Sequence, residues 1–320
     1  MTFIGSKGEK ATRQGFSDAL LELGREHPNV VVLGADVSPS VKVDSFAKEF
    51  PAKFFSVGVA EADMMGIAAG LTLVGKTAFA SAYGEFATGR PFDQIRQSLA
   101  YSRVPVKICA SHCGITVGQD GATHQSLEDI ALMRVLPHMT VISPCDYLET
   151  KRAVKASLSV TDGPVYIRFF RDNSPMFTED ATPFEIGKAN LLVEGSDVTI
   201  IAAGLQVWEA IKAAERLHED GISARVINMH TIKPLDKDAL VGAARETGAI
   251  VTAEDHQIHG GLGSAVAEFL AQTCPTPQEF VAVHDTFGES GKGEELMRKY
   301  GIARDDIVHA AKRALGRKQM

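Results

Sequence analysis

Two histidines and an aspartate lie close together in the glycine-rich stretch ASHCGITVGQDGATHQSLED, residues 110–129. Histidine side chains donate or accept protons near neutral pH and hydrogen-bond to oxygen atoms. Glycines allow tight turns and let the backbone approach a ligand closely. A lone His124 would more often be incidental on a surface, but His112, Asp120 and His124 on one loop favour a functional site.

A single carboxylate, Glu61, interrupts the apolar stretch FSVGVAEADMMGIAAG, residues 55–70. An acid in the first turn of a helix interacts favourably with the helix dipole, and this is the simpler interpretation. The alternative is a buried group that donates or accepts a proton. The local sequence does not choose between the two.

Aromatic and cationic side chains supply further candidates. Tyr83 and Phe86 are core aromatics by default, but an aromatic at a strand end can also stack on a flat heterocycle. Arg13, Arg168 and Arg171 could bind a phosphate or carboxylate with bidentate geometry, although each alone is more often a surface ion-pair partner.

The elements that must position these residues alternate along the chain: short β-branched apolar runs are followed by longer amphipathic segments. This alternation predicts βαβ units and mainly parallel sheets, hence an α/β fold with functional groups at the carboxyl ends of strands. Strands are expected at residues 30–35, 53–58, 77–81, 104–111, 140–144, 164–169, 197–204, 224–230, 248–255 and 280–285. Helices are expected near 10–26, 60–73, 90–101, 126–135, 146–159, 205–219 and 262–272.

The alternation is interrupted at residues 170–190, which contain prolines and many polar residues. Such a segment is typical of a linker. We therefore expect two domains, each a mainly parallel sheet flanked by helices, over residues 1–175 and 190–320, with a linker at 176–189.

Composition limits the classes of partner. The net charge of −7 disfavours nucleic acid or an anionic membrane as the main partner. No stretch reaches the ~18 uninterrupted apolar residues that a membrane span needs, and the first residues do not resemble a signal peptide. The four cysteines lack a convincing zinc spacing, so we expect buried free thiols in a reducing cytoplasm.

Three motifs together resemble a known family: GVAEADMMGIAAGL, GQDGATHQSLEDIALMR and SPCDYLET. They are similar to the pyrimidine-binding and C-terminal domains of transketolases, and the resemblance extends from Ala11 to the end of the chain. The most similar form is the split transketolase, whose catalytic unit is shared between two polypeptides. The resemblance implies dependence on thiamine diphosphate.

The resemblance also implies roles for the cofactor-facing residues. Glu61 matches the family glutamate that contacts ring nitrogen N1′ of the cofactor's aminopyrimidine, and an apolar pocket would suit that role, because desolvation raises a carboxyl pKa. Tyr83 matches the aromatic that stacks on the aminopyrimidine, and Phe86 its neighbour. Asp36 matches an acid that lines the cofactor cleft.

Further matches concern the substrate. His112 and His124 match residues that hold sugar oxygens and assist proton transfer, and Asp120 matches one that contacts a substrate hydroxyl. The positions expected to hold a terminal phosphate are Arg13, Ser40 and Arg171. Gln119 replaces a glutamate that is common in the family, with an effect that the sequence does not define.

One family motif is missing. No Gly-Asp-Gly, which holds Mg²⁺ and the diphosphate in thiamine diphosphate enzymes, occurs in this chain. By analogy with split transketolases, the resemblance implies an N-terminal partner subunit that carries the metal ligands, in an α2β2 heterotetramer acting on sugar phosphates. No metal ligand is expected on this chain.

The activity implied is the transfer of a two-carbon ketol unit from a ketose phosphate to an aldose phosphate. The alternative is the β subunit of a 2-oxoacid dehydrogenase E1 component, which the pairing of His112 with Asp120 disfavours, because a sugar's hydroxyls need such partners. A non-catalytic subunit of the same fold is a third interpretation. The only support for a further alternative, a nicotinamide-dependent dehydrogenase, is HGGLGSA, an incomplete dinucleotide fingerprint.

Overall fold

Seven strands form the first sheet of the computed structural model, which describes residues 4–318 of the chain. Every neighbouring pair is parallel except the first, which is antiparallel. In spatial order the strands are β12 (Thr231–Lys233), β6 (Thr140–Ile142), β7 (Val165–Arg168), β5 (Lys107–Ser111), β4 (Thr77–Tyr83), β2 (Val30–Gly34) and β3 (Phe54–Ser56).

Helices cover both faces of this sheet, which explains why β2 reads as an uninterrupted apolar run. Val30 and Val32 pack into the core on one face, and Val31 and Leu33 into the core on the other. The first face is covered by α1 (Thr12–Glu26), α2 (Asp44–Glu49) and α7 (Tyr147–Ala156), and the second by α3 (Glu61–Leu73), η2 (Ile95–Tyr101) and α6 (Asp129–Val135). Shorter turns are η1 (Pro51–Lys53), α4 (Gly84–Thr88), α5 (Phe92–Gln94), η3 (Ile115–Asp120) and η4 (Ser157–Ser159).

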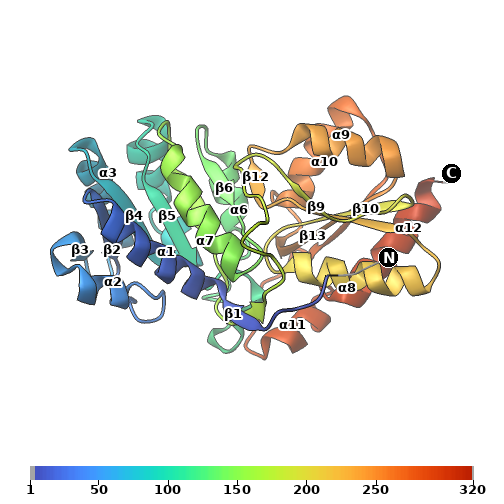
Figure 1. Ribbon diagram of the computed structural model, residues 1–320, viewed down its shortest axis with the longest axis horizontal. Coiled ribbons are helices and arrows are strands. Elements are labelled where there is room, and N and C mark those ends of the chain that lie inside the picture. Colours follow the sequence, from blue (N-terminus) through green and yellow to red (C-terminus); the bar gives the residue numbers. More distant parts are fainter. Residues whose placement is uncertain (1–3, 319–320) are drawn as a thin grey trace.

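A second sheet of five strands follows along the chain, and only its last strand in spatial order is antiparallel to its neighbour. The strands are β14 (Gln278–Val283), β13 (Ile250–Gln257), β10 (Val198–Ala202), β11 (Ala224–Asn228) and β9 (Asn190–Val193). In Figure 1, α9 (Lys237–Thr247) and α10 (Leu262–Thr273) lie above this sheet, and α8 (Gln206–Glu219) and α12 (Arg304–Lys318) lie below it. The short helix α11 (Gly293–Lys299) adds Leu296 to the lower core.

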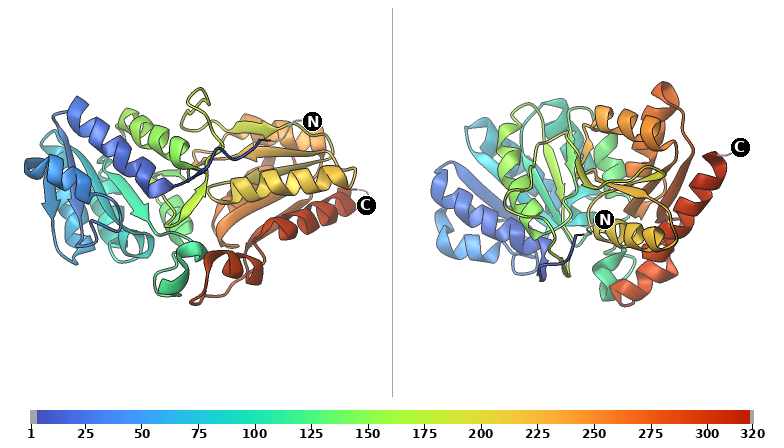
Figure 2. Two further views of the ribbon diagram at one scale, coloured as in Figure 1. Left: turned by 60° about the horizontal axis from the view of Figure 1, so that its bottom comes forward. Right: turned by 45° about the vertical axis from the view of Figure 1, so that its right-hand side comes forward.

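Contacts at several places join the two halves of the chain. The edge strand β12 belongs to the second half but pairs with β6 of the first sheet. Within the first half, a small antiparallel sheet forms from β1 (Glu9–Ala11) and β8 (Asn173–Pro175). The N-terminal segment runs beside α8 in both views of Figure 2, and Ile4 packs against the core of the second sheet.

The expected α/β class, with two mainly parallel sheets flanked by helices, is confirmed. Each expected strand overlaps an observed one, while α2, α9, α11, α12, β9 and β12 were not anticipated. The helix expected from 126 begins at Asp129, and the one expected near 90–101 is divided into α5 and η2. Residues 176–189 form no helix or strand, and the domain boundaries expected around them stay a prediction.

Two further expectations concern bulk properties. All four cysteines are free thiols, three of them buried and Cys274 partly exposed, as expected. Within the described residues, no helix has both the length and the apolar character that crossing a membrane demands.

Candidate active site

The carboxyl ends of neighbouring strands bring most of the predicted site residues to one edge of the first sheet. Arg171, His112, Tyr83 and Asp36 lie at or just after the ends of β7, β5, β4 and β2, which are consecutive in the sheet. Because these strands are parallel, their carboxyl ends lie side by side. Glu61 follows β3 and is the first residue of α3. The sequence prediction of a shared edge is therefore confirmed.

Four aromatic side chains form a cluster at this edge. The ring centroid of Tyr83 lies 4.1 Å from that of His112, 5.8 Å from that of Phe86 and 6.1 Å from that of His124. Phe86 and His124 meet edge to face with centroids 5.1 Å apart. Tyr83 and Phe86 are half-buried, so the cluster combines flat apolar faces with two imidazoles that can hydrogen-bond.

His112 is buried and electrically neutral at physiological pH. Its side chain is 2% exposed, and its Nδ1 lies 2.9 Å from the Ser111 hydroxyl oxygen. Burial and the nearby charges of Arg13 and Arg171, together with His124, lower the pKa of His112 to about 3. Its φ of 60° is uncommon outside glycine, so the backbone turns sharply after β5 to place this ring. A neutral imidazole at this place can donate or accept a hydrogen bond without carrying charge.

Glu61 is buried at 4% exposure, and its Oε1 accepts a hydrogen bond of 2.9 Å from Arg90 Nη1. The guanidinium of Arg90 also lies 3.8 Å from the centroid of the Phe86 ring. Met64 and Met65 are fully buried in the same helix, and the surroundings of Glu61 also include the charge of Arg90. An ion pair holds one of its oxygens, and no other hydrogen bond to this carboxylate occurs within the described residues.

Two arginines concentrate positive charge beside the aromatic cluster. Arg13 Nη1 donates to the Ser40 carbonyl oxygen at 2.7 Å, and Arg171 Nη1 donates to the Val117 carbonyl oxygen at 2.8 Å. Burial, followed by the charge of Arg171, lowers the pKa of Arg13. Arg171 also lies 3.4 Å from Asp120 Oδ1. Two cations that repel each other favour an anion between them, as a phosphate would provide.

Two other predicted residues behave differently. Asp36 is exposed just beyond β2 and has a φ of 60°. Its side chain forms no ion pair with another described residue. Arg168, a sequence candidate for binding an anion, is instead buried and pairs with Asp129 at 2.8 Å. Asp129 also accepts a 2.5 Å hydrogen bond from the Tyr166 hydroxyl. Arg168 is therefore a structural residue, because its charge is already compensated inside the fold.

The loop that carries His112 and His124 is held by the second sheet. Asp255 of β13 accepts a 2.9 Å hydrogen bond from the backbone of Ile115. At Gly114, whose φ is 83°, a Cβ would lie only 1.9 Å from Asp255 Oδ2, so this position requires glycine. The second half of the chain thus fixes the position of the histidine-bearing loop on the first.

Two charged residues at this edge were missed by the sequence analysis. Arg90 had no local pattern to mark it, since its partner Glu61 is 29 positions away. Glu85 lies in α4 between Tyr83 and Phe86, and burial, followed by the charges of Glu128 and Asp129, raises its pKa to about 7. In the sequence, only the neighbouring aromatic residues Tyr83 and Phe86 could have indicated that Glu85 lies at this site.

The residues at this edge fit one half of thiamine diphosphate. A buried carboxylate beside half-buried aromatic rings suits a flat heteroaromatic base whose ring nitrogen forms a hydrogen bond. Within residues 4–318, no three His, Cys, Asp or Glu side chains are grouped as a metal ion would require. The donor set at this edge therefore fits the aminopyrimidine half of the cofactor.

Comparisons with known proteins agree with this geometry. The family model of the transketolase pyrimidine-binding domain matches residues 8–176, and that of the transketolase C-terminal domain matches residues 187–307. A 6-deoxy-6-sulfo-D-fructose transketolase subunit of Clostridium sp. is 44% identical over 96% of this chain and 95% of its own length. One of the apulose-4-phosphate transketolase subunits of Phocaeicola vulgatus is 41% identical over 94% of this chain and 96% of its own length.

Among solved structures, a split gene transketolase, described as an inactive β4 tetramer, superposes with a TM-score of 0.90 at 48% identity. The match covers 96% of this chain and 99% of that one. The chain therefore belongs to the transketolase family and corresponds to the C-terminal subunit of its split form.

Proposed function

We propose that this member of the transketolase family, joined by an N-terminal subunit, transfers a two-carbon ketol unit from a ketose phosphate to an aldose phosphate. The observation that supports this most is the buried Glu61 carboxylate, held by Arg90 beside the cluster of Tyr83, Phe86 and the two histidines. Thiamine diphosphate, when bound, supplies the electron sink that stabilises negative charge on the transferred unit.

Glu61, Tyr83, Phe86 and Asp36 form the cofactor side of the proposed site. Glu61 holds a proton between its carboxylate and N1′ of the aminopyrimidine, and its burial keeps water from competing for that proton. Tyr83 and Phe86 orient the flat ring by stacking. Asp36, exposed at the end of β2, lines the entrance of the cleft.

The remaining residues form the substrate side. His112 and His124 hydrogen-bond to substrate oxygens and move protons at the reacting carbon, while Asp120 accepts a hydrogen bond from a neighbouring hydroxyl. Arg13 and Arg171, with Ser40, bind the terminal phosphate, which relieves the repulsion between the two guanidinium groups. Gln119 is exposed next to Asp120.

The proposed assembly is an α2β2 heterotetramer in the cytoplasm, in which the partner subunit supplies Mg²⁺ ligands and the diphosphate site. The missing Gly-Asp-Gly motif is the sequence observation behind this division of the site. A solved relative described as an inactive β4 tetramer agrees with it. Because relatives are named for a sulfonated and a branched sugar, the donor panel should include such ketoses beside the pentose phosphates.

The experiment compares Glu61→Gln with Asp63→Asn in the reconstituted two-chain enzyme with Mg²⁺, thiamine diphosphate, xylulose 5-phosphate and ribose 5-phosphate, and repeats this with the other ketoses. Asp63 is the matched control, because it is an exposed acid in the same first turn of α3. We expect Glu61→Gln to lose at least about 100-fold in turnover, and Asp63→Asn to keep wild-type turnover. Equal turnover for wild type and Glu61→Gln would count against the mechanism.

A 2-oxoacid decarboxylation assay with a dye acceptor, run on the same complex, checks the alternative reaction. Turnover there and none with any ketose would replace the transketolase proposal by a dehydrogenase E1 function.

A further inference from the structure

Residues 119–124 leave the fold as a short loop, and this loop carries two of the proposed substrate residues, Asp120 and His124. The loop is exposed or half-buried except at Gly121, whereas the residues on either side of it are buried. The His124 ring forms a 2.9 Å hydrogen bond through Nδ1 with the hydroxyl of Thr123, a residue of the same loop that moves with it. The positions of both substrate-facing side chains therefore depend on how the two ends of the loop are held.

Gln125 closes the base of this loop with its side-chain amide. Its side chain is buried, and Nε2 donates to the Ile115 carbonyl oxygen at 3.0 Å and to the Glu289 carbonyl oxygen at 2.9 Å. The Gly118 carbonyl oxygen lies farther from Nε2, at 3.5 Å. All three neighbours are acceptors, so the amide turns its nitrogen toward them, and its two hydrogens can serve the two nearer oxygens. Within the described residues, the Gln125 Oε1 has no hydrogen-bond partner, so the bonds of the nitrogen are what this amide contributes.

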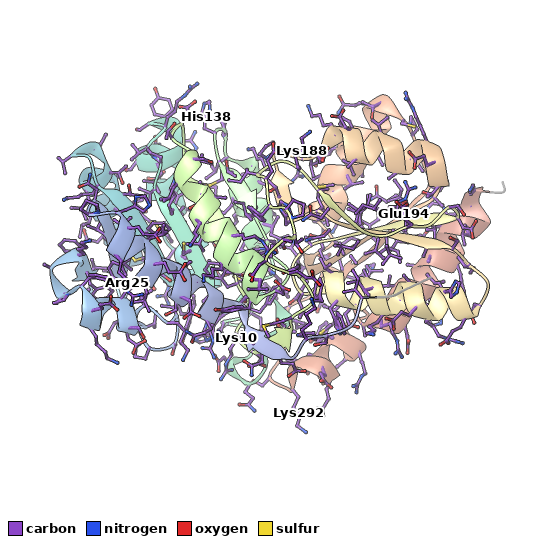
Figure 3. The ribbon with its side chains drawn as sticks, in the orientation of Figure 1. Lys10, Arg25, His138, Lys188, Glu194 and Lys292 are labelled. Atoms are coloured by element: carbon purple, nitrogen blue, oxygen red, sulfur yellow. The ribbon has the colours of Figure 1, made fainter. Side chains whose placement is uncertain are left out.

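One of these bonds connects the two halves of the chain. Glu289 belongs to residues 284–292, which join β14 to α11 in the second half, and α11 lies beside η3 in both views of Figure 2. Lys292, at the end of this segment, points away from the fold at the lower edge of Figure 3. The contact is close, because a Cβ at Gly288 would lie 2.0 Å from Gln125 Oε1. The segment 284–292 therefore packs directly on the base of the loop.

We propose that Gln125 is a positioning residue, which ties loop 119–124 to the second half of the chain and so holds its two substrate-facing side chains in place. This inference rests on the proposed function, because that function gives Asp120 and His124 a substrate to contact. It also gives the second half of the chain a part in the reaction, although none of the predicted cofactor or substrate residues lies there. A misplacement of about 1 Å can cost about 100-fold in rate, so a single bridging amide is enough to matter.

The experiment compares Gln125→Met with Gln278→Met in the reconstituted two-chain enzyme. Methionine keeps the length of glutamine and removes the amide. Gln278 is the matched control, because its buried Nε2 donates to the Gly263 carbonyl oxygen at 2.9 Å, and it begins β14, whose other end leads into residues 284–292.

In Gln125→Met we expect kcat to fall at least about tenfold, because the substrate-facing side chains lose their support. The thiamine diphosphate concentration for half-maximal activity should stay within about twofold of wild type, because the residues of the cofactor side lie on other elements. Gln278→Met should keep both values. A purely structural role of Gln125 would change thermal stability and leave the kcat of the folded enzyme as it is.

Gly288→Ala tests the same contact from the second half of the chain, because the added Cβ would meet Gln125 Oε1. It should lower kcat as Gln125→Met does. The double variant should lie within about threefold of the slower single variant, because both changes remove one shared contact. Losses in kcat that multiply in the double variant would contradict a common bridge.

Hydrogen exchange of the backbone amides of residues 114–125 measures the bridge without catalysis. These amides should exchange at least about tenfold faster in Gln125→Met than in wild type, and at the wild-type rate in Gln278→Met. Unchanged exchange, a wild-type kcat in Gln125→Met, or equal losses of kcat in Gln125→Met and Gln278→Met overturns the proposal. Failure of the proposed function gives a different result, a wild-type complex without ketol transfer, and hydrogen exchange still reports on the bridge in that case.

Discussion

Arg90 and Glu61 form an ion pair at the edge of the first sheet, with 2.9 Å between Arg90 Nη1 and Glu61 Oε1. The glutamate is buried, while the arginine side chain is 48% exposed and covers the Phe86 ring. One arginine therefore positions both the carboxylate and an aromatic wall that the cofactor would contact.

Replacing Arg90 should impair the proposed reaction without unfolding the chain. In Arg90→Gln we expect kcat to fall and the thiamine diphosphate concentration for half-maximal activity to rise, each by about tenfold, because Glu61 and Phe86 lose their common support. Arg90→Lys should recover part of the loss, since lysine keeps the charge but not the planar stacking. Arg96→Gln, at an exposed arginine of η2, is the control and should behave as wild type. A wild-type response in Arg90→Gln would remove this residue from the site.

The neutral state of His112 makes stability depend on pH. Its pKa is about 3 in the folded chain, whereas an unfolded histidine titrates near 6.5. Between these values the unfolded chain binds the extra proton, so the contribution of His112 is complete above about pH 6.5 and is lost progressively as the pH falls toward 3.

His112→Asn removes this titration, and asparagine tolerates the positive φ at this position. Between about pH 7 and about pH 5, the wild-type free energy of unfolding should fall by about 2 kcal/mol more than that of His112→Asn. Urea unfolding at the two pH values measures the difference. His27→Asn, at an exposed histidine, should retain the wild-type dependence. An identical pH dependence for wild type and His112→Asn would show that the imidazole is not held neutral.

The buried pair of Arg168 and Asp129 should contribute to stability rather than to substrate binding. Asp129→Asn leaves the Arg168 guanidinium buried without its counter-charge, and we expect a loss of about 3–5 kcal/mol in the free energy of unfolding. The exposed pair of Arg103 and Asp162 is the comparison, and Asp162→Asn should cost less than about 1 kcal/mol. Urea denaturation measures both, and equal small losses would contradict the structural role of Arg168.

Arg171 should affect the binding of phosphorylated substrates selectively. In Arg171→Gln, the KM for a ketose phosphate should rise by about tenfold or more, because one charged hydrogen-bond donor to the phosphate is lost. The KM for the same ketose without its phosphate should stay unchanged. Steady-state kinetics of the two-chain enzyme on the matched substrates measures this. Equal increases for both substrates would place Arg171 outside the phosphate site.

The sequence determined the fold class and the edge of the sheet that carries the site. Alternation of β-branched runs and amphipathic segments requires parallel strands with helices on both faces, and parallel strands place their carboxyl ends together. Residues that follow these strands, such as Tyr83 and His112, could therefore be grouped before the structure was known. The spacing of the cysteines likewise predicted that they are free thiols, and periodicity predicted the α/β class.

Only the tertiary structure decided which charged side chains are free to contact a ligand and which are paired inside the fold. Arg168 and Arg171 are only three positions apart. Arg168 is buried and paired with Asp129 inside the fold, whereas Arg171 reaches the site, near Asp120. The pairing of Arg90 with Glu61, the docking of β12 onto β6 and the contact of Gly114 with Asp255 join residues that are distant in the chain. Local periodicity carries no information about such contacts, because they depend on how the helices and sheets pack against one another.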